Sequence, residues 1–192
     1  MNRRHTPFIF ALLFLTSLST FTASAQEAIT MGYFSRVGIQ PGIQAGLLFD
    51  LGSINDSGTR ARSVFLSPQA AVFTRPGINT NYLLRVESGI SQKSRSERSF
   101  SALSVSAGYL FKTEVESVSV SLGSGEITDK ARTNTHHFVP ALHSTYGRYF
   151  SEKWSWFTKI GLGYRFEKED LGTTTLFFEA GVHLSLKNIA KS

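Results

Sequence analysis

A few residues in the chain have the side-chain types used in acyl transfer. They are His143-Ser144, His136-His137 and Glu152. Acyl transfer needs a nucleophile within hydrogen-bond reach of a base, and a third group that orients the base. Neighbouring residues of a β-strand point to opposite faces, so His143 and Ser144 would not pair within a regular strand. The sequence therefore predicts no catalytic residues, and we expect the protein not to be an enzyme.

Other kinds of site lack the residues that they need. The sequence contains no cysteine, which excludes disulfides and thiolate metal sites. The pair His136-His137 has no third ligand nearby in the sequence, so a solvated loop pair is expected there rather than a metal site. Residues 123–125 (Gly-Ser-Gly) lack the lysine and the helix that follow in a phosphate-binding loop. We expect neither a metal nor a cofactor.

Length and composition favour one compact domain. The chain has 192 residues, of which 41% are hydrophobic and 18% are charged. Twenty Lys and Arg against fourteen Asp and Glu give a formal charge of +6. Two of the arginines, Arg3 and Arg4, belong to the leader described next, which leaves 18 − 14 = +4 for the mature chain. This small excess does not indicate nucleic-acid binding, and at most it suits contact with anionic lipid or polysaccharide.

The first 25 residues have the pattern of a secretory signal peptide. A basic start at Arg3 and Arg4 precedes an apolar run over residues 8–15, and residues 23–25 (Ala-Ser-Ala) form a small-x-small cleavage site. The alternative, an uncleaved membrane anchor, would need about 20 apolar residues. We predict cleavage after Ala25, followed by a short periplasmic leader over residues 26–36. The predicted β-barrel covers residues 37–187, and residues 188–192 form a C-terminal tail.

The mature chain shows the two-residue period of β-strands. In residues 154–167 one alternating set is almost wholly apolar, whereas the other is mainly small or charged, and residues 175–187 repeat this pattern. Residues 62–73 and 138–150 alternate less cleanly, and we expect bends or bulges at Pro68 and Pro140. The eight predicted strands are residues 43–50, 62–73, 81–90, 103–111, 117–122, 138–150, 154–167 and 175–187.

The connections between these segments predict an orientation. Tight turns are expected at residues 75–79, 112–114 and 151–153, and longer loops at residues 51–61, 91–99, 124–136 and 167–172. Short turns that alternate with long loops are typical of bacterial outer-membrane barrels, in which the turns face the periplasm. We therefore predict an all-β, up-and-down antiparallel transmembrane barrel of eight strands, with short periplasmic turns and longer outer loops.

The two faces of the strands predict which side meets lipid. A soluble barrel would point its apolar face inward, whereas a membrane barrel has the reverse arrangement. Glycines such as Gly161 and Gly163 suit a crowded interior, and aromatic residues near the turns suit a membrane interface. The predicted interfacial aromatics are Tyr109, Phe111, Tyr149, Phe150, Trp154 and Trp156. The polar face would then form a lumen charge network of Arg85, Glu87, Lys159, Arg165, Glu167, Glu179 and His183, with His143 as a further candidate.

These mixed charges allow two interpretations. The first is structural: buried charges are costly unless they are paired, so the network would fill the barrel as a salt-bridged plug. The second is a narrow polar path, which would need the plug to rearrange because side chains just fill an eight-stranded barrel.

The last strand carries the most specific resemblance to a known family. Residues 179–186 (Glu-Ala-Gly-Val-His-Leu-Ser-Leu) fit the pattern polar-x-Gly-x-x-apolar-x-apolar. Over residues 37–187 the chain resembles the small outer-membrane β-barrels that include the OmpA transmembrane domain and OmpX. The resemblance implies an outer-membrane location in a Gram-negative bacterium. It also implies an assembly signal at Glu179, Gly181, Leu184 and Leu186, which the barrel-assembly machinery would read.

Three functions are compatible with this pattern. The first is a non-enzymatic barrel with a structural or surface-interaction role, whose partners would be outer-membrane lipid, lipopolysaccharide and surface ligands. The second is a narrow channel or porter for small polar solutes. The third, a lipid A acyl-modifying enzyme, is disfavoured because the resemblance implies a His-x-Ser pair on the lipid-facing side, and the candidate pair His143-Ser144 does not have that spacing. Basic residues expected in the outer loops could contact lipopolysaccharide; they are Arg60, Arg62, Lys93, Arg95, Arg98, Lys130 and Arg132.

Overall fold

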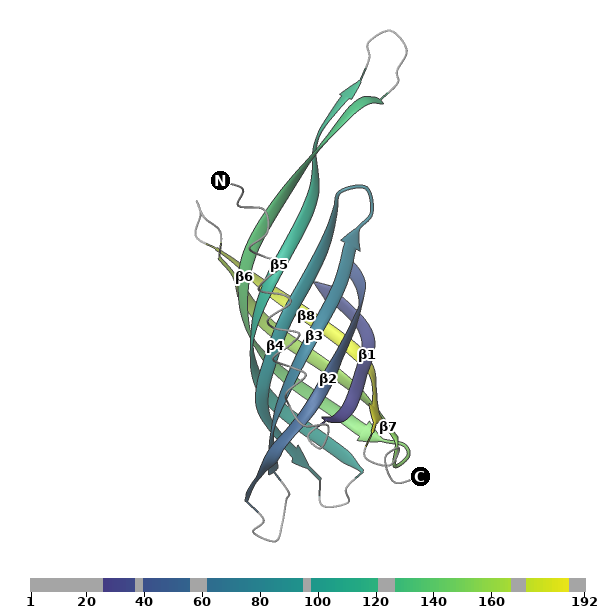
Figure 1. Ribbon diagram of the computed structural model, residues 1–192, viewed down its shortest axis with the longest axis vertical. Helices are drawn as coiled ribbons and strands as arrows, with labels where there is room; N and C mark the ends of the chain where they lie inside the picture. Colours follow the sequence, from purple (N-terminus) through teal and green to yellow (C-terminus); the bar gives the residue numbers. More distant parts are fainter. Residues whose placement is uncertain are drawn as a thin grey trace, which may run out of the picture.

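The computed structural model describes residues 26–36, 40–55, 62–94, 98–120, 127–166 and 172–186. Over these ranges the chain forms eight antiparallel strands that close into a barrel (Figure 1). Each strand pairs with the next, and β8 pairs with β1. The strands are β1 (Gln26–Arg36), β2 (Gln40–Asn55), β3 (Arg62–Arg75), β4 (Asn79–Lys93), β5 (Ser99–Val120), β6 (Ile127–Tyr149), β7 (Trp154–Arg165) and β8 (Thr173–Ser185). The prediction of an up-and-down barrel of eight strands is confirmed.

The two-residue period decides which face of each strand is buried. In β7, Phe157, Lys159 and Gly161 point into the barrel, whereas Ile160 and Leu162, in the alternate positions, lie on the outside. The same alternation of buried and exposed residues runs along β4 and β8. The barrel therefore has an apolar outer face and a lumen filled by polar, aromatic and small residues. No helix among the described residues is long and apolar enough to cross a membrane.

The first strand corrects one prediction. Residues 26–36 do not form a leader: they form β1, which pairs with β2 and closes the barrel against β8 from Ala28↔Ser185 to Arg36↔Phe177. The barrel thus begins well before residue 37. Apolar residues occupy both faces of β1, with Phe34 buried and Met31 and Tyr33 outside, so this strand lacks the apolar-polar alternation that marks the others.

The predicted turn at residues 112–114 is also wrong. The predicted strand 103–111 and residues 117–120 of the predicted strand 117–122 belong to one long strand, β5, whereas residues 121–122 lie outside the described residues. Lys112, Thr113 and Glu114 pair with β4 and β6 in the middle of β5. Lys112 Nζ lies 2.6 Å from Glu114 Oε1 because residues two apart share one face of a strand. The predicted total of eight strands is nevertheless correct, because β1 was not predicted as a strand whereas β5 was predicted as two.

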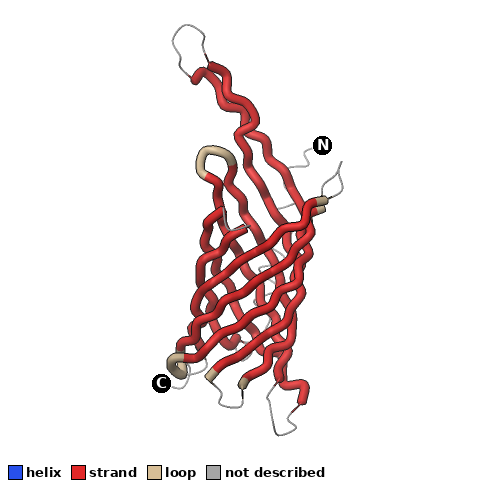
Figure 2. Tube along the Cα trace, turned by 180° about the vertical axis from the view of Figure 1, so that it is seen from behind, coloured by secondary structure: helices blue, strands red, loops and turns tan. Residues whose placement is uncertain are grey.

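These two errors shift the ends of the barrel. We call the end where β1 begins and β8 finishes the terminus end; it also holds the connections β2–β3, β4–β5 and β6–β7. The opposite end, where β5 joins β6, is the hairpin end. The turn at residues 76–78 lies at the hairpin end and residues 150–153 lie at the terminus end, so the predicted grouping of these turns on one side is wrong. Figure 1 shows the β5–β6 hairpin extending past the other strands, and Figure 2 shows it from behind.

The turn between β3 and β4 has a clear local cause. Pro76 and Gly77 occupy its centre, Gly77 has a φ of 75°, and Ile78 N donates to Arg75 O over 3.0 Å. Proline fixes the first central residue of such a turn, and glycine tolerates the positive φ of the second. This short connection holds β3 and β4 in register from Arg75↔Asn79 to Arg62↔Gln92.

Candidate functional site

The lumen is the candidate site, and its side chains form three layers along the barrel axis. The middle layer, which we call the charged layer, contains Arg85, Glu87, Lys159 and Glu179 from β4, β7 and β8. Above it, at the hairpin end, an apolar seal contains Phe34, Ala71, Phe73, Leu83, Leu110, Val139 and Phe177. Below it, at the terminus end, a cavity opens among Phe65, Phe100 and His183.

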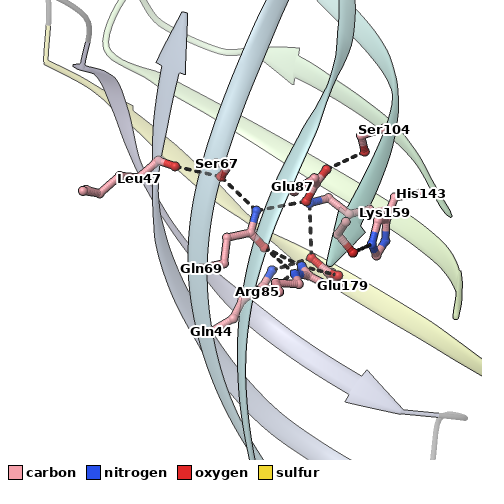
Figure 3. A network of polar contacts seen from close by, with 11 residues as sticks. Gln44, Leu47, Ser67, Gln69, Arg85, Glu87, Ser104, His143, Lys159 and Glu179 are labelled. Carbon is pink, nitrogen blue, oxygen red and sulfur yellow. Dashed lines mark hydrogen bonds and ion pairs between the residues drawn. The ribbon is translucent and has the colours of Figure 1, made fainter. Parts of the chain in front are cut away.

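Glu87 is held by cationic and neutral donors from different strands (Figure 3). Lys159 Nζ donates to its Oε2 over 2.6 Å, and Gln69 Nε2 donates to the same oxygen over 3.0 Å. Ser104 Oγ donates to Oε1 over 2.6 Å. Both oxygens of this carboxylate, which is 1% exposed, are thereby hydrogen-bonded.

Glu179 has a parallel set of partners. Arg85 Nη2 lies 2.6 Å from its Oε1, and Gln44 Nε2 donates to its Oε2 over 2.8 Å. Lys159 Nζ lies 3.5 Å from the same Oε2, so the lysine lies between the two carboxylates. The charged layer therefore spans the barrel interior and does not consist of isolated pairs.

Two amides connect the layer further. Arg85 donates through Nε to Gln69 Oε1 over 2.9 Å and through Nη2 to the same oxygen, and it also donates to Gln44 Oε1 over 3.3 Å. Ser67 receives a hydrogen bond from Gln69 Nε2 and donates its own to Leu47 O. The layer holds two cations and two carboxylates, so its formal charge is zero, as burial requires.

A histidine adjoins this layer. His143 is 1% exposed, and its Nε2 lies 2.8 Å from Ser106 Oγ. Ser144 lies on the outer face of the barrel, so the predicted separation of His143 and Ser144 onto opposite faces is confirmed. His143 Nδ1 has no hydrogen-bond partner in the described part of the chain. No carboxylate therefore orients this imidazole as an acyl-transfer site would need.

The apolar seal closes the hairpin end. The rings of Phe34 and Phe73 have centroids 5.0 Å apart, those of Phe34 and Phe177 are 5.6 Å apart, and Phe34 and Phe73 are fully buried. Arg85 Cζ lies 5.6 Å from the centre of the Phe34 ring, which joins the seal to the charged layer. A cavity of only about 10 Å³ is left beside the seal. Such a space is too small to form a continuous water path.

The terminus end of the lumen is less tightly packed than the hairpin end. A cavity of about 70 Å³, which we call the vestibule, reaches from Lys93 and Tyr149 at the mouth to Glu87 and Lys159 of the charged layer. This volume has room for a few water molecules. His183 lies beside it, stacked on Phe157 with ring centroids 4.5 Å apart.

The structure places only some residues of the predicted lumen charge network next to one another. Arg85, Glu87, Lys159 and Glu179 lie in one layer. His183 belongs to the vestibule wall, and Arg165 lines the small cavity at the hairpin end with Arg36. Glu167 lies outside the described residues. The prediction missed the neutral members of the layer, which are Gln44, Ser67, Gln69, Ser104 and Ser106. The signal available in the sequence was their parity, that is, their place among the alternating positions of β2, β3 and β5 that point into the barrel.

The predicted assembly signal has structural surroundings, but its role stays a prediction. Glu179 belongs to the charged layer. Gly181 lies against Gly32 of β1, where a side chain would overlap the Met31 carbonyl. Leu184 pairs with Ile29 and Trp154 near the terminus end, and Leu186 follows the last residue of β8.

The predicted interfacial aromatics lie at two ends and not in one cluster. Tyr149, Phe150, Trp154 and Trp156 surround the β6–β7 connection at the terminus end. Tyr109 and Phe111 lie toward the hairpin end, where they contact His136: the Tyr109 hydroxyl is 2.6 Å from His136 Nδ1 and the Phe111 ring centroid is 5.1 Å from that of His136. His136 and His137 lie on β6 and not in a loop as predicted. Across the described ranges, no group of three His, Cys, Asp or Glu could hold a metal ion.

Comparisons with known proteins agree with this architecture. No family model matches the chain, and no curated protein matches it. Among solved structures, the N-terminal β-barrel domain of OprF from Pseudomonas aeruginosa is similar, with 12% identity, a TM-score of 0.54, and coverage of 84% of this chain and 99% of that one. The attachment invasion locus protein Ail of Yersinia pestis has 11% identity, a TM-score of 0.45, and coverage of 83% and 99%. The strand order and the similarity to the OprF domain together show the fold of a small eight-stranded β-barrel.

Proposed function

We propose that the chain is an outer-membrane β-barrel protein of a Gram-negative bacterium with a structural or surface-interaction role and a lumen closed to diffusion. The observation that carries this proposal is the apolar outer face. Leu103, Ile160 and Leu84 are each about 60% exposed, and they belong to a continuous surface over several strands. Water would make an apolar surface of this extent costly, whereas lipid solvates it.

The filled lumen supports the closed state. The charged layer and the apolar seal occupy consecutive levels, and side chains of an eight-stranded barrel leave no continuous channel. Aromatic residues near both ends of the barrel, such as Tyr109 and Trp156, suit the two interfaces of a bilayer.

The proposal includes the route to the membrane and its partners there. Residues 1–25 would be removed as a signal peptide, and the barrel-assembly machinery would insert the mature chain with its termini in the periplasm. Lipopolysaccharide and surface ligands would meet the hairpin end. The basic residues predicted to face outward do not form one group, because Arg62, Lys93 and Arg98 lie at the terminus end whereas Lys130 and Arg132 lie on the β5–β6 hairpin.

A narrow path for small polar solutes is the second candidate, and the vestibule is the observation that favours it. The cavity already reaches Glu87 and Lys159 from the terminus end. Only the charged layer and the seal separate it from the hairpin end, so a solute path would need both to move.

The test combines cell fractionation with electrophysiology. We expect the protein in the outer-membrane fraction, where it should migrate faster on gels before heating than after heating. The purified folded barrel should give no steady conductance in a planar bilayer. Recovery in the soluble periplasmic fraction would contradict the membrane location. Steady unitary conductance would contradict the closed lumen and support the narrow path for small polar solutes.

A further inference from the structure

The terminus end carries a basic depression on its rim, which shares Lys93 and Tyr149 with the mouth of the vestibule. Its wall is formed by Lys93, Arg98, Arg148, Tyr149, Phe150, Ser151, Glu152 and Trp156, and its open volume is about 810 Å³. These residues come from β4, β6, β7 and two of the three connections at this end, β4–β5 and β6–β7. We call this feature the rim cleft.

Strand pairing fixes the positions of its cations. Arg148 pairs with Ser99 on one side and Trp156 on the other, and Tyr149 N donates to Arg98 O over 2.9 Å. Lys93 Nζ lies 5.8 Å from the centre of the Tyr149 ring. Three cations therefore lie around one depression because four neighbouring strands end there.

The charge of the cleft is not neutralised within the described residues. No carboxylate there forms an ion pair with Lys93, Arg98 or Arg148, and Glu152 is the one carboxylate in the described wall. The charged layer of the lumen differs, because every cation in it has a carboxylate partner. An external anion can therefore bind in the cleft without displacing an internal partner.

The aromatic residues indicate what kind of anion fits. Trp156 packs edge-on against Tyr146 with ring centroids 5.8 Å apart, and both lie on the outer face with Phe150. Leu142 and Ile160 continue this apolar surface along the same strands. A ligand with a phosphate at the cations and acyl chains along the apolar surface would match both parts.

We propose that the rim cleft binds the headgroup phosphate of an anionic glycerophospholipid in the leaflet on the terminus side. This inference rests on the membrane location proposed above. Lys93, Arg98 and Arg148 contact the phosphate and the glycerol headgroup, whereas Trp156 and Phe150 lie at the level of the ester groups. Glu152 disfavours additional negative charge and so limits the cleft to one headgroup.

The test measures lipid binding to the full chain folded in detergent micelles. Native mass spectrometry would count retained lipids during titration with dioleoyl phosphatidylglycerol, dioleoyl phosphatidylcholine or inorganic phosphate. We expect phosphatidylglycerol to bind more tightly than phosphatidylcholine, and inorganic phosphate not to compete at equal concentration. The double variant Arg98→Gln/Arg148→Gln should lose phosphatidylglycerol affinity by on the order of tenfold.

A matched control removes two cations from the opposite end. Arg75→Gln/Lys112→Gln changes the net charge equally and should retain the wild-type affinity. Equal loss in both double variants, equal binding of the two lipids, or full competition by inorganic phosphate would overturn the proposal. Failure of the wild-type chain to insert into vesicles would reject the membrane location as well, whereas insertion without lipid preference would reject the cleft alone.

Discussion

The two ends of the lumen contain similar numbers of aromatic side chains but differ in how tightly these side chains pack. At the hairpin end, Phe34, Phe73 and Phe177 pack on each other and leave almost no space. At the terminus end, Phe100 and Phe157 stack on His183, and Phe100 and His183 border a vestibule of about 70 Å³. One end is therefore a packed apolar core, and the other is a cavity with room for water that reaches the charged layer.

This difference explains where the charges lie. The ion pairs of Glu87 and Glu179 lie between the dry seal and the vestibule, and each carboxylate has a cation and neutral donors around it. Charges at this depth are tolerated because each has a partner of opposite charge. The removal of one partner should thus cost more than the removal of an apolar group at either end.

The largest effect is expected in the charged layer. Glu179→Ala leaves Arg85 buried without its carboxylate and should reduce the free energy of unfolding by about 3–5 kcal/mol. Urea unfolding of the folded barrel in lipid vesicles would measure it. The double variant Arg85→Met/Glu179→Leu, which removes both charges, should recover most of the loss. Equal destabilisation by the single and double variants would contradict the importance of pairing.

The two aromatic ends should respond differently to truncation. Phe73→Ala opens a cavity in the fully packed seal and should cost about 3 kcal/mol or more. Phe100→Ala borders the existing vestibule, where water can enter, and should cost about 1 kcal/mol less. The same urea titration compares the two variants. A larger loss for Phe100→Ala would contradict the assignment of the tightly packed end to the seal and of the end with room for water to the vestibule.

A smaller effect is expected at the glycine beneath His143. A methyl group at Gly161 would overlap the His143 ring, so Gly161→Ala should cost about 1–3 kcal/mol. In a second variant, His143→Ser in the Gly161→Ala background should restore part of the stability because the ring is gone. Unchanged unfolding of Gly161→Ala would show that the ring moves freely, which the packed lumen does not allow.

The smallest effect is expected for an ion pair outside the lumen. Lys112 and Glu114 are 2.6 Å apart but partly exposed, so Lys112→Gln should change stability by about 0–1 kcal/mol. The Arg85–Glu179 and Lys112–Glu114 pairs have the same separation of 2.6 Å but differ in burial. Comparison of Lys112→Gln with Glu179→Ala therefore separates the effect of burial on stability from the effect of distance. A loss for Lys112→Gln as large as that for Glu179→Ala would mean that burial does not decide the energy of these pairs.

The fold was largely predictable because the period of two is a local property of the sequence. β7 and β8 alternate cleanly and were predicted nearly to their ends. β1 was missed because Met31, Tyr33 and Phe34 make both of its faces apolar. β5 was divided because Lys112, Thr113 and Glu114 have the composition of a turn, whereas their pairing with β4 and β6 depends on distant residues.

The charged layer was predictable in part for the same reason. Parity assigned Arg85, Glu87, Lys159 and Glu179 to the inward face, but parity does not define height along the barrel. Height depends on strand register, which separates His183 and Arg165 from the other four. The neutral partners Gln44 and Gln69 also have the inward parity, but parity does not show which inward side chains bind the carboxylates, and their contacts do.

The central claim is that the apolar outer face meets lipid while the polar face lines a closed lumen. The sequence contains no cysteine, so single cysteines can be introduced and labelled without background. We would compare Ile160→Cys on the outer face with Ser151→Cys at the β6–β7 connection, both folded in vesicles, for reaction with a membrane-impermeant maleimide. Ser151→Cys should react readily once the reagent reaches its side of the membrane, and Ile160→Cys should stay unlabelled until the vesicles are dissolved. Equal reaction of the two cysteines, with the reagent present on both sides of an undissolved membrane, would contradict the claim.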